Sequence, residues 1–124
     1  MSSRIYGEIN RHPWVTLNVE AKGGTQEIKF LVDTGFDGEL VIPRSLTSLF
    51  GTSSDFFEVD FADGDREQSM IVQCRVQWLD GYREVTVLYT DGNTPLLGME
   101  LLDDCTVTLE NGGDQRGVII EPFQ

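Results

Sequence analysis

Short runs of alternating apolar and polar residues dominate this chain. In residues 15–19, valine and leucine alternate with threonine and asparagine, which is typical of a strand with one buried face. Similar runs, separated by turns rich in Gly, Asp and Asn, predict further strands over residues 27–32, 40–42, 56–62, 67–79, 84–89, 107–109 and 118–120. Asp63-Gly64 and Asp80-Gly81 are typical of two-residue hairpin turns. The pattern predicts an all-β domain, either a small barrel or a sandwich.

Helical patterns are confined to two short segments. Residues 43–50 predict one helical turn that ends at Gly51, and residues 99–103 predict a short helix near the C-terminus. No repeat or low-complexity tract divides the sequence, and 124 residues suffice for a single domain. We expect one domain over residues 13–124, preceded by an N-terminal arm over residues 1–12 that is a candidate dimer contact.

The net charge of the chain disfavours some classes of binding partner. The formal net charge is −12, which disfavours nucleic acids and anionic membranes because both are bound through Lys and Arg. An acidic, solvated surface is the simplest interpretation, and a preference for basic substrates is the alternative. Residues 1–11 lack the apolar core of a signal peptide, and no apolar run approaches the ~18 residues that a membrane span needs. We therefore expect a cytoplasmic protein.

Neither the cysteines nor the acidic residues predict a metal site. The chain has two cysteines and one histidine, and their spacing does not fit zinc. Both cysteines lie in apolar runs, so buried free thiols are expected, with one disulfide as the alternative. Two acidic groups do not have the spacing of a loop that binds a hard cation: Asp33, Asp37 and Glu39; and Asp60, Asp63 and Asp65. We expect no metal and no cofactor.

The candidate chemistry lies at Asp33-Thr34-Gly35, where two apolar strands meet. A carboxylate at such a turn is a candidate general base. One ionised carboxylate can only accept a proton, whereas two in contact share one, so one member activates a water and the other polarises a carbonyl. The chain holds a single Asp-Thr-Gly and no Asp-Ser-Gly. A second carboxylate would therefore come from a second copy in a two-fold homodimer.

In these features the chain resembles the retropepsin-like aspartic proteases, especially the small prokaryotic ones. The matching segments span about residues 13–102: the strands over 13–19 and 28–32, the Asp33-Thr34-Gly35 triplet, the Asp63-Gly64 hairpin and the run over 95–102. The resemblance implies an all-β, closed acid-protease barrel with one short C-terminal helix. It also implies a homodimer whose terminal strands interleave, with residues 118–120 at the interface, and a peptide or protein substrate.

The resemblance also implies roles for individual residues. The catalytic residues would be Asp33, Thr34 and Gly35: Thr34 would hydrogen-bond across the dimer axis, and Gly35 would let the substrate backbone approach closely. Ala62, Asp63 and Gly64 would form the tip of a flap that closes over the peptide. Leu96-Leu97-Gly98 would pack behind the catalytic loop. The substrate-binding set is Phe36, Asp37, Ala62, Asp63, Gly64 and Leu97.

Two positions depart from the pattern of the family. Phe36 stands where the family usually has Ala or Ser, and its ring could narrow the substrate groove. Met99 stands where the viral members have an arginine that pairs with the residue equivalent to Asp37, which leaves Arg4, Arg11 or Arg44 as candidate partners. We expect an aspartic endopeptidase. The alternative is a non-catalytic dimeric peptide-binding or scaffolding module with the same fold, in which Phe36 blocks the groove.

Overall fold

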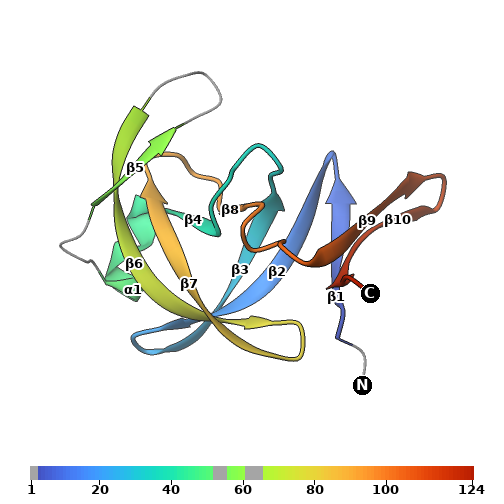
Figure 1. The fold of residues 1–124 in the computed structure, drawn as a ribbon, viewed down its shortest axis with the longest axis horizontal. Coiled ribbons are helices and arrows are strands. Elements are labelled where there is room, and N and C mark those ends of the chain that lie inside the picture. The colour runs from blue at the N-terminus through green and yellow to red at the C-terminus, as the bar shows by residue number, and fades with distance from the viewer. Residues whose placement is uncertain (1–2, 52–55, 61–65) are drawn as a thin grey trace.

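The structure, a computed structural model, describes residues 3–51, 56–60 and 66–124. Ten strands make up most of it (Figure 1), and the all-β class that the sequence pattern predicts is confirmed. They are β1 (Ile5–Asn10), β2 (His12–Ala21), β3 (Gly24–Val32), β4 (Leu40–Pro43), β5 (Phe56–Asp60), β6 (Arg66–Trp78), β7 (Gly81–Thr90), β8 (Leu96–Leu97), β9 (Cys105–Gly112) and β10 (Gln115–Pro122). A short 3-10 helix, Arg44–Leu46, leads into α1 (Thr47–Phe50).

Six of these strands close into a barrel in the order β2-β3-β8-β4-β7-β6. The ring closes because β6 also pairs with β2, at the single residue pair Val19 and Val76. The pairs β3–β8 and β4–β7 are parallel, and the other pairs of the ring are antiparallel. Of the two architectures that the strand pattern leaves open, the protein adopts the barrel.

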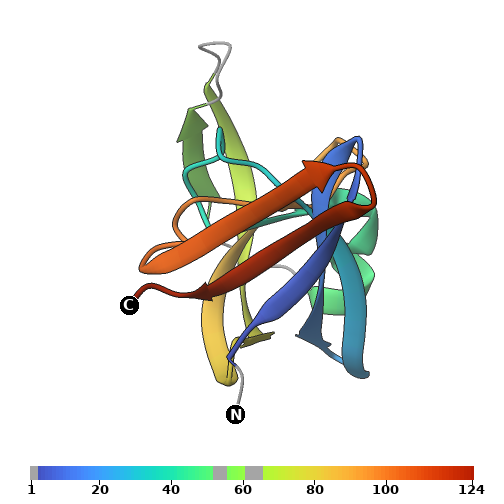
Figure 2. The same ribbon diagram turned by 90° about the vertical axis from the view of Figure 1, so that its right-hand side faces the viewer.

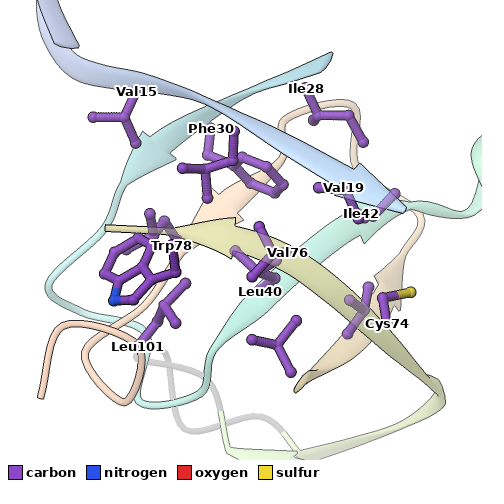
Figure 3. Close-up of a cluster of buried hydrophobic side chains, with 14 of the residues drawn as sticks. Val15, Val19, Ile28, Phe30, Leu40, Ile42, Cys74, Val76, Trp78 and Leu101 are labelled. Atoms are coloured by element: carbon purple, nitrogen blue, oxygen red, sulfur yellow. The ribbon is translucent and has the colours of Figure 1, made fainter. Parts of the chain in front are cut away.

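The alternating residues of the strands fill the barrel. Val15, Leu17 and Val19 of β2 point inward and are at most 3% exposed, as their spacing predicts. They pack with apolar side chains from every other strand of the ring, and Figure 3 shows this cluster. Its other members include Phe30, Leu40, Ile42, Val76, Val85, Val87, Tyr89 and Leu97. Their burial supplies the main stabilisation of the fold.

The helical turn over residues 43–50 is confirmed, and it is held by a buried hydrogen bond. The Tyr89 hydroxyl donates to the Gly51 carbonyl oxygen over 2.5 Å. The helix expected over residues 99–103 is wrong: residues 99–104 form consecutive turns. Cys105 N–H reaches the carbonyl of Leu102, three residues back, and Asp104 adopts φ 59°. The Asp103 N–H likewise reaches the carbonyl of Glu100, three residues back, so this segment makes turns and lacks the four-residue spacing of α-helical hydrogen bonds.

The hairpin between β6 and β7 lies one residue away from its predicted position. Trp78 pairs with Gly81, so the two turn residues are Leu79 and Asp80, and Leu79 has φ 54°. Gly81, which the sequence pattern predicts as a turn residue, is therefore the first residue of β7. The Asp63-Gly64 turn lies outside the described residues.

The chain termini form a second sheet in the order β1-β10-β9 (Figure 2). Ile5–Gly7 of β1 pair with β10, and Glu8–Asn10 pair with β2. The strand changes partner at Gly7, where an added Cβ would lie under 3.0 Å from the Trp14 carbonyl oxygen. Residues 5–10 of the expected N-terminal arm thus pair with β10 and β2 of their own chain.

Among the described residues, no helix is long and apolar enough to cross a membrane. Cys74 is buried and Cys105 is half-buried, and both thiols are free. Burial raises the pKa of the Cys74 thiol from its ordinary value of 9.0 to about 11. Cys74 is therefore a neutral core residue at physiological pH.

We expect this buried thiol to make the protein sensitive to alkali. The unfolded chain releases the Cys74 proton near pH 9, whereas the folded chain holds it to about pH 11, so stability is lost as pH rises between these values. The loss is about 1–3 kcal/mol. Urea midpoints measured across this range should fall less steeply for Cys74→Val than for the unmodified protein. If the urea midpoints of the two proteins fell equally with pH, the loss of stability in alkali would not come from Cys74.

Candidate active site

Asp33 begins the loop that joins β3 to β4, and main-chain bonds fix its position. Val32 pairs with Leu97 of β8, and the next N–H, that of Asp33, donates to the Leu97 carbonyl oxygen over 2.9 Å. The Gly35 N–H donates to Oδ1 of Asp33 over 2.9 Å. The carboxylate is therefore held by its own loop in one orientation, half-buried at the end of a barrel strand.

The residues after Asp33 present the loop to solvent. Thr34, Gly35 and Asp37 are exposed, which leaves Thr34 accessible to a second molecule. A side chain at residue 35 would begin 3.2 Å from Oδ1 of Asp33, so glycine keeps the carboxylate uncrowded.

Phe36 belongs to this loop but turns its ring beneath it, and the residue is only 9% exposed. Its ring packs with Val41 and Leu88 in a small apolar cluster that Ile71 and Leu96 border. An added Cβ on Gly38 or Gly98 would come within 3.0 Å of ring atoms of Phe36, so these two glycines form the slot that holds the ring. The main chain of Phe36 is also fixed, because its N–H donates to Asp33 and its carbonyl accepts from Met99.

The segment over residues 97–100 supports the loop from behind. Gly98 N–H donates to the Glu39 carbonyl oxygen over 2.9 Å, and Glu100 N–H donates to the Gly38 carbonyl oxygen over 3.1 Å. Leu97 itself is fully buried in the core. Its side chain offers no surface to a substrate, so Leu97 positions the loop, and its expected substrate-binding role is not supported.

Glu39 and Arg83 form a polar link that sequence reasoning missed. The Glu39 side chain is only 10% exposed, and its Oε2 lies 3.5 Å from Nη2 of Arg83 on β7. Its Oε1 accepts the Thr86 N–H over 3.0 Å. One signal was present, because Glu39 directly precedes the wholly apolar run 40–42 and a carboxylate there needs partners.

The partner proposed for Asp37 is not found among the arginines that the sequence suggests. Arg4 lies 3.5 Å from Glu121, and Arg44 lies 3.4 Å from Asp91. Within the part of the chain that the structure describes, neither Asp37 nor Arg11 takes part in an ion pair. The ion pair beside this loop is instead formed by Glu39 and Arg83, from positions that do not match the family pattern.

A hollow of about 160 Å³ lies beside the loop. It is lined by Gly38, Glu39, Thr86, Leu88 and Glu100, so its wall carries two carboxylates and one apolar side chain. The flap residues Ala62, Asp63 and Gly64 lie outside the described residues. The strands that lead to them, β5 and β6, form an antiparallel pair from Phe56 and Met70 to Asp60 and Arg66.

Comparison with solved structures identifies the fold. A crystal structure of a retropepsin-like aspartic protease from Rickettsia conorii matches 97% of this chain and 91% of its own, with a TM-score of 0.64 and 17% sequence identity. No family model matches the sequence, and no curated protein matches it. At this level of identity the likeness shows the fold alone, and the expectation of a retropepsin-like fold is confirmed.

Proposed function

We propose, from the premise of a retropepsin-like fold, that this protein is an aspartic endopeptidase that works as a homodimer. Asp33 of each copy would supply one of two carboxylates that share a proton. The ionised member takes a proton from a water, which attacks the peptide carbonyl, while the protonated member polarises the carbonyl oxygen. The tetrahedral intermediate then collapses: the C–N bond breaks as the carboxyl that took the proton from water gives it to the leaving nitrogen, and the hydroxyl of the new carboxylic acid returns a proton to the dyad, so that no metal and no covalent intermediate is needed.

The observation that carries this proposal is the way in which Asp33 is held. Its N–H bonds to Leu97, its Oδ1 accepts from Gly35, and its carboxylate remains half-buried at the surface of the loop. A turn-forming aspartate without chemistry has no need of a loop that three further hydrogen bonds, from Gly98, Met99 and Glu100, secure from behind. Fixed geometry of this kind is what positions a general base.

The placement of Phe36 favours the enzyme over the non-catalytic binding module. That alternative requires the ring to stand in the substrate groove. The ring is instead buried in the slot formed by Gly38 and Gly98. Phe36 thus adds apolar contacts under the loop, and we assign its expected substrate-binding role to support of the loop.

The proposal is tested by incubating the protein with a mixed peptide library from acidic to neutral pH. We expect cleavage that a statine-type transition-state mimic blocks, and an activity per molecule that rises with protein concentration because a dimer forms the site. Peptide binding without cleavage at any pH would favour the non-catalytic module. Cleavage that persists unchanged at saturating inhibitor would contradict an aspartic mechanism.

A further inference from the structure

The terminal sheet of this protein is completed within one chain. β10 pairs with β1 along one edge and with β9 along the other. Val118 and Ile120 of β10 are at most 1% exposed and belong to the core of their own chain. At residues 118–120 neither edge of β10 is therefore free, so the interleaving of terminal strands expected there cannot use these residues in the arrangement seen.

The open edge of this sheet belongs to β9. In the described part of the chain, β10 is the one strand that pairs with β9, so one row of its backbone N–H and C=O groups lacks strand partners. Proteins usually protect such an edge with lysine, proline or a very short strand. β9 is eight residues long and contains no Lys, Arg or Pro.

The side chains of β9 suit contact with a second copy. Leu109 is 55% exposed, although its neighbour Val107 is partly buried against the core. Each copy carries a net charge of −12, so two copies repel each other wherever acidic residues meet. Residues 105–109 carry no charge, whereas the neighbouring strands β1 and β10 include Glu8 and Glu121.

The position of β9 links it to the candidate site. Met99 and Glu100 donate main-chain hydrogen bonds to Phe36 and Gly38, and β9 begins at Cys105, at the end of the same turn segment. In Figure 1 this segment runs beneath the loop between β3 and β4. A second copy bound along β9 would therefore lie next to the loop that needs a second carboxylate.

We propose that β9 pairs antiparallel with β9 of a second copy, about a two-fold axis at Thr108. This register sets Leu109 opposite the partner's Val107 and Glu110 opposite the partner's Thr106, so apolar residues meet and like charges do not. The two terminal sheets become one continuous sheet. The inference rests on the proposed function for its need of a dimer and names the surface that forms it.

Two experiments test this edge in the absence of substrate. Sedimentation velocity should show that Leu109→Asp raises the dimer dissociation constant by at least about a hundredfold, because it places a charge in the interface. Tyr82→Asp, at a side chain that is 59% exposed on the β6–β7 hairpin, adds the same charge and should leave the dimer unchanged. Circular dichroism checks that both variants fold.

Cross-linking gives a second measurement. In a Cys105→Ser background, oxidised Thr108→Cys should form a covalent dimer, since residues opposite each other lie within disulfide reach. Thr106→Cys, four positions from its own symmetry mate, should not.

A wild-type monomer at all concentrations, an unchanged Leu109→Asp dimer, or equal cross-linking at both positions would overturn the proposal. Failure of the proposed function would appear separately, as uninhibited or absent cleavage by an intact β9 dimer.

Discussion

Replacing Asp33 with asparagine is expected to lower kcat/KM for peptide cleavage by at least about a thousandfold. Asparagine has the same shape, and its Oδ1 can still accept the Gly35 N–H, so the loop keeps its conformation. The amide cannot take a proton from water, and two amides cannot share one. Cleavage of a library-derived peptide, measured across the pH range of the wild type, gives the loss.

If Asp33 is the catalytic carboxylate, Asp33→Asn lowers cleavage without changing folding or dimer formation. Sedimentation should therefore show the same dimer for Asp33→Asn as for the wild type, with the same melting temperature within about 2 °C. Asp91→Asn is the matched control, because it removes one carboxylate that is 84% exposed and pairs with Arg44 at the surface. Full activity in Asp33→Asn would exclude Asp33 as the catalytic carboxylate.

Gly98→Ala is expected to destabilise the protein by about 3 kcal/mol, the upper end of the usual cost of overpacking. The new Cβ would lie under 3.0 Å from the carbonyl oxygens of Gly38 and Phe36 and from the Phe36 ring. Two of these atoms are backbone, so the loop that carries Asp33 must shift. Thermal unfolding should begin about 10–15 °C lower than in the wild type. Cleavage should also be slower at temperatures where the variant is still folded, because the loop that carries Asp33 has shifted.

The control for this effect is Gly81→Ala, because an added Cβ at Gly81 meets no atom within 4 Å. It should change stability by less than about 0.5 kcal/mol. The double variant Phe36→Ala/Gly98→Ala removes the clash with the ring and retains those with the two carbonyls, so it should remain unstable. A Gly98→Ala protein that melts with the wild type would show that the slot is less rigid than the structure indicates.

The strands could be predicted from sequence wherever burial alternates strictly. The residues Val15, Leu17 and Val19 reveal β2 because each faces the core. The strand β1 is hidden because Gly7 interrupts the pattern of Ile5 and Ile9, and only its partners on β2 and β10 make it a strand. The helix expected over residues 99–103 failed for a similar reason: hydrogen bonds to the Asp33 loop set that backbone, and local propensity does not.

The candidate site was predictable where its chemistry is local. Asp33, Thr34 and Gly35 are adjacent in the chain, and both their order and the strands around them are visible in the sequence. The pairing of Glu39 with Arg83 joins the loop before β4 to β7, two segments distant in sequence, so the partner of Glu39 was not predictable. The burial of Phe36 depends on two glycines, Gly38 and Gly98, that meet only after β4 and β8 pair.

The single residue pair that closes the barrel has a consequence for how the protein folds. The hairpins β2–β3 and β6–β7 need only local contacts and can form early, whereas Val19 and Val76 must find each other across the intervening chain. Joining them costs conformational entropy, because it turns two ribbons into a ring. The Asp33 loop lies in the chain between these residues, but its hydrogen bonds come from residues 97–100, so a nascent chain can hold its carboxylate in place only after that later segment has been made.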